Sequence, residues 1–253
     1  MKIEFFFKFV KDILFPIFCV ECGKEGEWWC DECLNRRNFP PVLKCPGCEA
    51  ETAEGRICPA CIFGCPLDGA VALAIYDEGQ PLAKLVQAFK YQYAEETLAV
   101  WRKIFQKILG DACRLPPPLQ GGGEGAVFIP VPLHPRRERE RGFNQAALLA
   151  RVFVEEIKKF RLIGGQAAGG RVELLENALL RRRYTSQQAR LSKKERAKNM
   201  SGAFVWAGQS PCPEKVWLVD DVFTTGATLR ECAAVLKSVG AKEVWALTLG
   251  RVI

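Results

Sequence analysis

The sequence predicts an α/β protein with a mainly parallel central sheet and helices on both faces, preceded by a small cysteine-rich module. Two observations support this prediction. Short apolar runs rich in β-branched residues alternate with helical patterns from residue 67 onward, which is typical of parallel sheets covered by helices. Four CxxC pairs lie within the first 61 residues, a spacing typical of metal-binding loops. We therefore divide the chain into residues 1–66 and 67–253.

Residues 1–18 predict an amphipathic helix, because Glu4, Lys8, Lys11 and Asp12 interrupt an otherwise apolar segment. Its phenylalanine face is expected to pack on the protein, and a helix lying on a membrane surface is the alternative. The segment has no small-residue cleavage site, and the sequence has no uncharged stretch of about 18 residues that could span a bilayer. We expect a cytoplasmic protein without disulfides or a membrane span.

The four CxxC pairs supply enough thiolates for two tetrahedral sites, with zinc as the expected metal. An iron–sulfur cluster is the alternative for the same ligands. We pair the motifs sequentially, although the spacing leaves a cross-braced pairing open. Closed four-thiolate sites are structural and stabilise a module too small for a large core. The expected ligands are Cys19, Cys22, Cys30 and Cys33 in the first site, and Cys45, Cys48, Cys58 and Cys61 in the second.

The main domain is expected to have strands at 71–76, 127–133, 216–219 and 244–249. Helices are expected at 80–93, 95–109, 144–160 and 227–239. Stretches 115–125 and 164–170 are rich in glycine, the first also in proline, and indicate surface insertions. The last strand–helix–strand pattern predicts a right-handed βαβ unit. Ligands of such sheets bind beyond the carboxyl ends of the strands.

An acidic pair and a threonine-rich turn follow the strand at 216–219. Asp220 and Asp221 can accept hydrogen bonds from vicinal sugar hydroxyls, directly or through a hydrated Mg²⁺. The turn leads into a helix, where unpaired backbone N–H groups favour a phosphate, although a simple threonine N-cap is the alternative. Carboxylates on one side and a phosphate cradle on the other match a ribose 5-phosphate. The expected cradle is Thr224, Thr225, Gly226, Ala227 and Thr228.

The string at 216–228 resembles the phosphoribosyl pyrophosphate (PRPP) signature of type I phosphoribosyltransferases. Phe223 stands where those proteins usually have an aliphatic residue. The resemblance implies PRPP, with Mg²⁺, as the ligand. It also implies the type I phosphoribosyltransferase fold for residues 67–253.

Two basic segments could complete such a site. Residues 134–145 lie just beyond a strand and are expected to form a pyrophosphate loop, with a solvated charged turn as the alternative. Residues 180–199 carry eight Lys and Arg and one acid, and predict a hood over PRPP or along a nucleic-acid backbone, or else a disordered loop. The expected loop residues are Arg136, Arg137, Arg141, Asn144 and Gln145, and the expected hood residues are Arg183, Thr185, Gln188, Arg196 and Asn199.

Charge divides with the domains. The formal charge of +7 splits into −2 for residues 1–66 and +9 for residues 67–253. A basic larger domain favours anionic ligands such as polyphosphates or nucleic acid, and charge alone does not specify which.

Over nearly its whole length the chain resembles the ComF/ComFC (GntX-like) competence-associated proteins. The segments that carry this resemblance are 12–23, 89–91, 129–145, 185–199, 202–204 and 219–229. The resemblance implies a phosphoribosyltransferase-type domain behind a zinc module, and a part in handling single-stranded DNA during natural transformation.

Two functions stay open. One is a PRPP-binding protein that engages single-stranded DNA or a protein of the competence machinery, in which Trp28, Trp29 and Phe39 stack on bases or fill the core of the zinc module. The other is an active, Mg²⁺-dependent phosphoribosyltransferase, whose acceptor no segment identifies.

Overall fold

The computed structural model describes residues 16–91, 94–110, 126–163, 171–183, 202–208 and 211–253. The expected N-terminal helix, the stretches 115–125 and 164–170 and most of the expected hood lie outside these residues. The helices are α2 (Asp31–Arg36), a short 3-10 helix η1 (Ala53–Gly55), α3 (Pro81–Tyr91), α4 (Ala94–Gly110), α6 (Pro135–Arg141), α7 (Gln145–Ile163) and α9 (Ala227–Ser238). The strands are β1 (Val42–Leu43), β2 (Gly69–Ile75), β3 (Ala126–Pro130), β4 (Val172–Leu174), β5 (Leu179–Arg181), β6 (Phe204–Trp206), β7 (Lys215–Phe223) and β8 (Glu243–Arg251).

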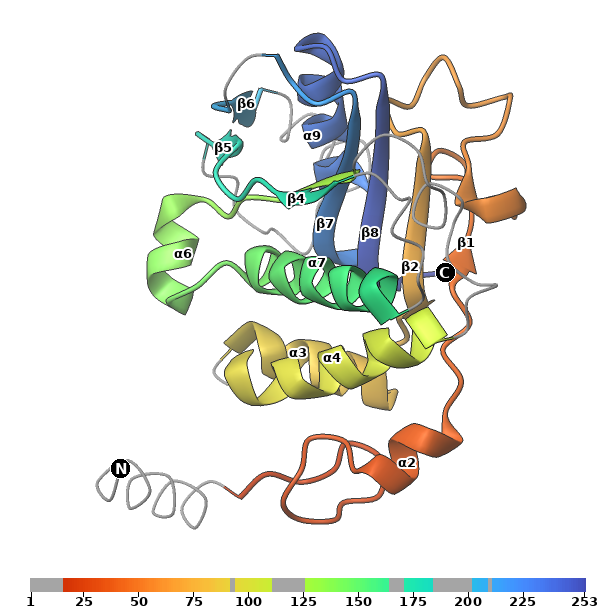
Figure 1. The fold of residues 1–253 in the computed structure, drawn as a ribbon, viewed down its shortest axis with the longest axis vertical. Helices are drawn as coiled ribbons and strands as arrows, with labels where there is room; N and C mark the ends of the chain where they lie inside the picture. Colours follow the sequence, from red (N-terminus) through yellow and green to blue (C-terminus); the bar gives the residue numbers. More distant parts are fainter. Residues whose placement is uncertain (1–15, 92–93, 111–125, 164–170, 184–201, 209–210) are drawn as a thin grey trace.

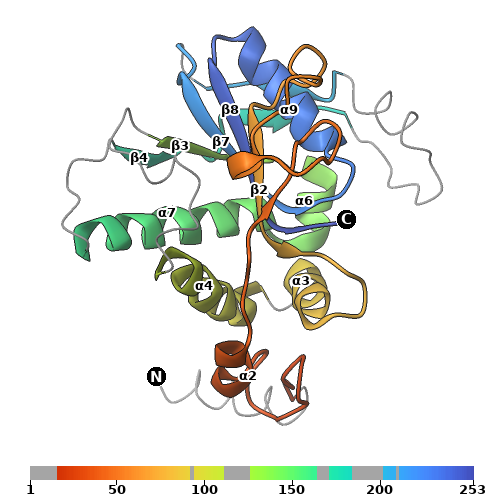
Figure 2. The same ribbon diagram turned by 90° about the vertical axis from the view of Figure 1, so that its right-hand side faces the viewer.

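A six-stranded sheet in the order β1-β2-β8-β7-β3-β4 forms the centre of the molecule. Its strands are parallel except that β1 runs antiparallel to β2. Helices α3, α4 and α7 cover one face and α9 covers the other (Figures 1 and 2). Strands β5 and β6 form a separate antiparallel pair. The α/β class with a mainly parallel sheet is therefore confirmed.

The residues of β7 alternate between the two faces of the sheet. Trp217 and Val219 pack in the core beneath α3, α4 and α7, whereas Val216 and Leu218 pack beneath α9. Trp217 lies between Phe128 and Trp245, with ring centroids 6.2 Å and 5.3 Å away. Successive side chains of a strand point to opposite faces, so a strand covered on both sides is apolar throughout.

The βαβ unit at the C-terminus is longer than the pattern predicted. We expected the strand to end at Val219, but β7 continues to Phe223 because β8 runs alongside it. In this pairing Asp220 lies opposite Thr248 and Phe223 lies opposite Arg251. The two aspartates therefore belong to the strand rather than to a loop.

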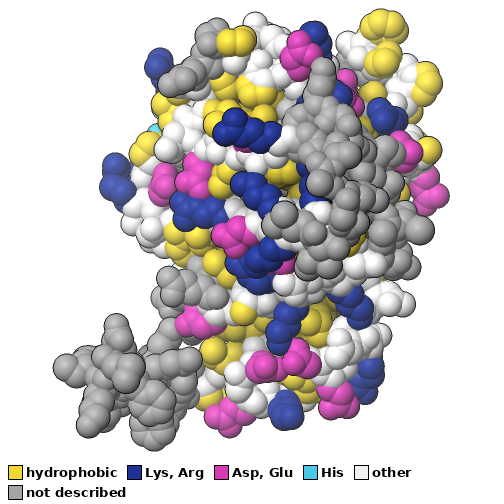
Figure 3. All heavy atoms as spheres, in the orientation of Figure 1, with side chains coloured by type: hydrophobic (Ala, Val, Ile, Leu, Met, Phe, Trp, Pro, Cys, Tyr) yellow, Lys and Arg dark blue, Asp and Glu magenta, His cyan; other side chains and the backbone are white. Residues whose placement is uncertain are grey.

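Ion pairs join α4 to α7. Glu156 of α7 is almost fully buried and accepts hydrogen bonds from Arg102 and, at 2.7 Å, from Gln106. Burial raises the pKa of Glu156, but hydrogen bonds from Lys159, Gln106 and Arg102 outweigh it and keep the pKa below its usual value. Figure 3 shows Lys and Arg side chains interspersed with Asp and Glu side chains over this face. Arg102, Arg151 and Lys159 of α4 and α7 each pair with a carboxylate.

The two halves of the cysteine-rich module lie in different places. The segment containing α2 lies beyond the α3–α4 pair, whereas residues 44–65 lie beside the β1–β2 edge of the sheet (Figures 1 and 2). Contacts cross the boundary expected near residue 66, because β1 pairs with β2 and Ile57 N donates to Asp68 O at 2.9 Å. Among the described residues, no helix combines the length and apolar character needed to cross a bilayer.

Candidate functional site

The eight expected cysteine ligands form two clusters. The first contains Cys19, Cys22, Cys30 and Cys33, and the second Cys45, Cys48, Cys58 and Cys61; within each cluster the sulfur atoms all lie within 4.8 Å of one another. The sulfurs of Cys22 and Cys30 are 3.7 Å apart, and those of Cys48 and Cys58 are 3.6 Å apart. Four sulfurs at about 2.3 Å from Zn²⁺ form a tetrahedron with edges of about 3.8 Å. The sequential pairing is confirmed, and both donor sets fit zinc.

One cysteine of each cluster is prepared to be a thiolate. Burial raises the pKa of Cys19, but backbone N–H groups of Cys22 and Cys30 outweigh it and lower the pKa to about 6. Cys45 has the same balance, with burial opposed by backbone N–H groups of Cys58 and Cys48, and its pKa is also lowered to about 6. Metal ligands must be deprotonated, so these N–H groups favour metal binding.

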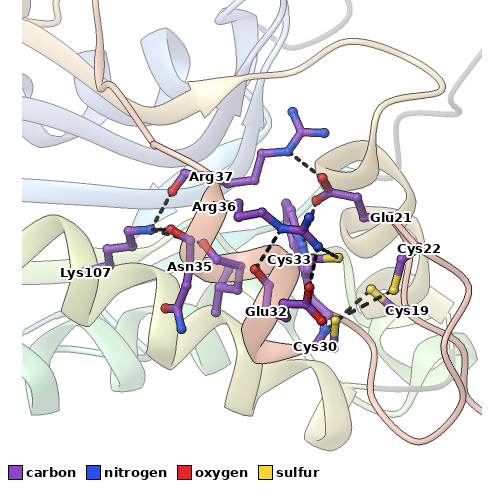
Figure 4. Close-up of polar contacts among 12 residues, drawn as sticks. Cys19, Glu21, Cys22, Cys30, Glu32, Cys33, Asn35, Arg36, Arg37 and Lys107 are labelled. Carbon is purple, nitrogen blue, oxygen red and sulfur yellow. Dashed lines mark hydrogen bonds and ion pairs between the residues drawn. The ribbon is translucent and has the colours of Figure 1, made fainter.

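The first cluster is fixed to helix α4 (Figure 4). Lys107 Nζ donates to the carbonyl oxygens of Leu34, Asn35 and Arg37 at 3.1, 2.9 and 2.6 Å, and so satisfies the end of α2. Trp29 and Phe39 are buried and pack edge to face with ring centroids 5.7 Å apart. The hypothesis that these two aromatic residues stack on bases is therefore wrong, because their rings form the core of the module.

The two aspartates of β7 point to opposite faces of the sheet. Oδ2 of Asp221 lies 3.2 Å from Lys90 Nζ of α3 and accepts a hydrogen bond from Gln145 Nε2 of α7 at 3.1 Å. Asp220 lies on the α9 side, where its charge acts on Cys232. The expectation that the pair lies in one loop fails because the strand continues through both residues.

Asp220 has a strongly raised pKa. Burial and the adjacent charge of Asp221 raise the pKa of Asp220 to about 7, although Lys90 and Arg181 act in the opposite direction. Negative charge is thus concentrated where three parallel strands end. A cation or a set of hydroxyl donors would relieve this repulsion, so the donor set fits Mg²⁺ as well as sugar hydroxyls.

Two residues of the expected pyrophosphate loop have different environments. Asn144 Oδ1 accepts a hydrogen bond from Ala146 N at 3.0 Å, so Asn144 caps α7. Gln145 is only 4% exposed, and its Oε1 has no hydrogen-bond partner among the described residues. A buried acceptor of this kind usually finds a partner, so it indicates a place for a ligand donor or a water molecule.

The threonine-rich turn forms the start of α9. Gly226 is the N-cap with φ of +68°, and the hydroxyl oxygen of the preceding Thr225 accepts a hydrogen bond from Ala227 N at 3.4 Å. A Cβ atom on Gly226 would lie 2.4 Å from Cζ of Phe223, so glycine is required both by conformation and by space. Thr224 is exposed, and Thr225 and Thr228 are half-buried around the same turn. The amide of Ala227 is therefore engaged by Thr225, and the amides of Thr228 and Leu229, which precede the first intrahelical donor Arg230 N, are the ones suited to an anion.

The expected pyrophosphate loop is a helix in its first part. His134 Nδ1 accepts from Arg136 N at 3.2 Å, Pro135 occupies the first turn, and Gly142 ends α6 with φ of +83°. Arg136 pairs with Glu140 at 3.1 Å, while Arg141 lies 6.0 Å from the ring centroid of Tyr91. The prediction of a loop here is wrong because proline and glycine define the two ends of a short helix.

Arg137 of α6 faces a cation that the sequence did not single out. Burial and the nearby charge of Arg137 lower the pKa of Arg181 in β5. Two guanidinium groups held this close favour an anion between or beside them. Of the expected hood residues, Arg183 is described and is exposed. The others, Thr185, Gln188, Arg196 and Asn199, lie outside the described residues.

A cavity of about 640 Å³ opens beside α6. Its wall includes His134, Asn144, Arg151 and Arg181, and it lies beside the aspartate pair rather than over it. Hydrogen bonds from Arg151 to the carboxylate of Glu176 close part of its rim.

Lys90 contacts an expected site residue, Asp221, but was not itself expected from the sequence. It lies in the Phe-Lys-Tyr segment that carried part of the family resemblance, but no pattern in the sequence placed it beside Asp221. Arg181 was missed for a similar reason, since its contact with the site depends on how β5 packs. The assembled edge offers carboxylates, cations and first-turn helix amides, which are the kinds of group that bind a phosphorylated sugar.

Comparison with known proteins identifies the family to which the chain belongs. The chain is 32% identical to Competence protein F of Haemophilus influenzae, over 92% of this chain and 84% of that protein. It is 27% identical to Competence protein ComFC of Streptococcus pneumoniae over 88% of this chain and 87% of that one. It is 26% identical to the DNA utilization protein YhgH of Escherichia coli K12 over 88% and 91%, respectively. No protein-family model matches the chain. The identity over most of both chains shows that this chain belongs to the ComF family of competence-associated proteins.

Proposed function

We propose that the chain binds PRPP at the carboxyl edge of its sheet and takes part in competence, by handling single-stranded DNA or by engaging another competence protein. The observation that carries the ligand assignment is that the aspartates of β7, the start of α9 and Oε1 of Gln145, which has no hydrogen-bond partner among the described residues, all lie at or follow the carboxyl ends of parallel strands. The competence role is supported by the names of the relatives, which include competence proteins and DNA utilization proteins.

In this proposal each part of PRPP meets a different element. The 5-phosphate binds the amides at the start of α9, and the ribose hydroxyls bind Asp220 and Asp221. The pyrophosphate extends toward Lys90 and Arg181, whose charges act on Asp220, and toward Arg137, whose charge acts on Arg181. Asp220 and Asp221 would hold Mg²⁺, which would supply positive charge beside the polyphosphate and offset the charge of Asp221 that helps to raise the pKa of Asp220.

Calorimetric titration with PRPP, with and without Mg²⁺, tests the ligand assignment. We expect saturable binding that strengthens with Mg²⁺ and is lost in the variant Asp220→Asn/Asp221→Asn. The matched control is Asp77→Asn, since Asp77 follows β2 and has no contact with the pair among those described. Equal binding by the double variant would reject the site.

The DNA part of the proposal is tested by the salt dependence of single-stranded DNA binding. If phosphate contacts dominate, the logarithm of the binding constant falls linearly with the logarithm of the salt concentration. The slope is about −0.7 for each contact on single strands. Arg183→Gln and Arg196→Gln should each reduce that slope, whereas Arg36→Gln in the first cysteine module should not. Binding that is absent, or insensitive to salt, would leave a protein partner as the competence contact.

One observation favours the catalytic alternative. A carboxyl group with a pKa of about 7 can accept a proton near neutral pH, and Asp220 has this property. In that reaction the bond from ribose C1 to pyrophosphate breaks, its electron pair leaves with pyrophosphate, and the acceptor nucleophile forms the new bond to C1. The cavity beside α6 offers room for an acceptor. Pyrophosphate release that depends on added acceptor, and not on PRPP alone, would favour this alternative.

A further inference from the structure

The second cysteine cluster lies directly against the carboxyl ends of β7 and β8. Arg251, the last residue of β8, is only 1% exposed. Its Nη1 donates to Lys44 O at 2.8 Å and its Nη2 donates to Cys45 O at 2.9 Å. Burying a guanidinium group costs free energy unless its N–H donors find acceptors. The carbonyl groups of Lys44 and Cys45 supply these acceptors to Arg251 of β8.

Arg230 connects the same cluster to the phosphate turn. Its Nη1 donates to Pro46 O at 2.8 Å, and Pro46 lies inside the turn from Cys45 to Cys48. Its Nη2 donates to Thr225 O, in the turn that begins α9. One planar side chain therefore holds two backbone segments that are 179 residues apart in sequence, as the positions of Pro46 and Thr225 give.

A second set of contacts runs through Phe223. The guanidinium carbon of Arg251 lies 4.4 Å from the ring centroid of Phe223, and Val252 N donates to Phe223 O at 3.0 Å. The ring of Phe223 occupies the space beneath Gly226, the N-cap of α9. The position of the N-cap thus depends on Phe223, and that of Phe223 depends on Arg251.

The turn from Cys45 to Cys48 is itself tightly constrained. A Cβ atom on Gly47 would lie 2.7 Å from Cβ of Cys61, so the two CxxC turns of the cluster are in close contact. The N–H groups of Gly47 and Cys58 both point to Sγ of Cys45 at 3.4 Å. A metal ion bound to all four sulfurs would fix the orientation of the carbonyl groups that Arg230 and Arg251 use.

We infer that the second cysteine cluster positions the phosphate turn through Arg230 and Arg251, so that metal binding there and ribose-phosphate binding strengthen each other. The inference rests on the proposed function, because it names a regulator of that same site. Arg230 is a positioning residue here, since its donors go to backbone carbonyls. Coupling between two binding sites is reciprocal, so each ligand changes the affinity of the other by the same factor.

The first test compares two arginine variants by calorimetric titration with PRPP. Lysine keeps the charge but cannot span both carbonyl groups as the guanidinium does. Arg230→Lys should weaken PRPP binding by about fivefold or more, the lower end of typical coupling. The matched control is Arg36→Lys, because Arg36 contacts the first cluster through Cys33 Sγ at 3.9 Å. Equal affinities in the two variants would overturn the inference.

The second test uses the unaltered protein, so it does not depend on whether a variant folds. Zinc release to a coloured chelator is followed with and without PRPP. We expect PRPP to slow the release of one zinc equivalent severalfold and leave the other unchanged, because among the described residues the second cluster, and not the first, is connected to the phosphate turn. Slowing of both equivalents, or of neither, contradicts the coupling.

A third measurement separates this inference from the proposed function. If the unaltered protein does not bind PRPP, the proposed ligand is wrong, but amide hydrogen exchange still reports the connection. Arg230→Lys should then raise exchange in residues 230–233, which include the first amide of α9 that donates within the helix, Arg230 N to Gly226 O, and in residues 47 and 48, and Arg36→Lys should not. Unchanged exchange in residues 230–233 would overturn the positioning role even if PRPP binds.

Discussion

Lys90 Nζ lies 3.2 Å from Oδ2 of Asp221, and this ion pair joins the end of α3 to the carboxyl end of β7. The same carboxylate oxygen accepts from Gln145, so three elements meet at one atom. The pair is largely shielded from solvent, with 20% and 11% of the two side chains exposed. Because solvent and salt screen a buried charge only weakly, the charge of Lys90 can act on a polyphosphate bound nearby.

Lys90→Gln should weaken PRPP binding by about tenfold, which corresponds to about 1.4 kcal/mol, because one charge-assisted contact to pyrophosphate is lost. The matched control is Lys84→Gln, an exposed lysine of the same helix α3. Calorimetric titration of both variants under identical salt measures the difference. If both variants bind as the unaltered protein does, Lys90 serves only to hold Asp221.

The pKa of Asp220 predicts how stability depends on pH. Because this pKa is raised from 3.8 to about 7, the folded protein binds the proton more tightly than the unfolded chain. The contribution of Asp220 to stability is therefore complete below about pH 4 and is lost as the pH rises to 7. At pH 8 the loss is at most about 4 kcal/mol, so Asp220→Asn should be the more stable protein there. Urea unfolding at pH 5 and pH 8 checks this, and an equal difference at both values would contradict it.

The same group should make PRPP binding depend on pH. Ionised Asp220 is the form that accepts hydroxyl hydrogen bonds, so affinity should rise between pH 6 and pH 8. Ionisation of the phosphates contributes to the same trend. Subtracting the profile of Asp220→Asn, which retains only the phosphate contribution, isolates the carboxylate. Parallel profiles would show that Asp220 does not contact the ligand.

Gly226→Ala tests the phosphate turn. The substitution imposes a left-handed conformation on alanine, which costs about 1–2 kcal/mol, and places its Cβ against the ring of Phe223. PRPP binding should be lost. Gly240→Ala at the other end of α9 is the control, because its φ of +110° imposes strain but no atom lies within 4 Å of the added Cβ. Binding should return in Gly226→Ala/Phe223→Leu if the ring causes the defect.

Metal analysis should find two zinc ions per chain, one for each cysteine cluster. Cys19→Ser and Cys45→Ser should each lower the content to about one, with a decrease in melting temperature, since structural zinc contributes directly to folding. The purified protein should be colourless. Visible absorption accompanied by iron would instead identify an iron–sulfur cluster.

The parts of the fold that depend on local pattern were predictable. The strand–helix–strand unit at the C-terminus was expected from its apolar periodicity, and α9 begins at Ala227 as expected. Strands β4, β5 and β6 were not expected, because each has three residues and owes its existence to its partner. Helix α6 was not expected, although Pro135 and Gly142 mark its ends, because a short arginine-rich segment also suits an anion-binding loop.

The composition of the site was more predictable than its geometry. Local sequence identifies residue types that bind phosphate, as in the turn at 224–228. It does not tell how far β8 extends beside β7, and that pairing sends Asp220 and Asp221 to opposite faces. The contacts of Lys90, Arg230 and Arg251 join segments far apart in the chain, so only the packed structure reveals them.

Strand β1 is only two residues long, and it lies in the chain between the two cysteine clusters. By pairing with Val71 and Ala72 it covers the outer edge of β2, whose residues are apolar and, from Gly69 to Leu73, buried. An uncovered edge of this kind can pair with a strand of another molecule. Loss of either metal would release one end of β1 and expose that edge. We therefore expect demetallation to reduce the solubility of the protein before the central sheet unfolds.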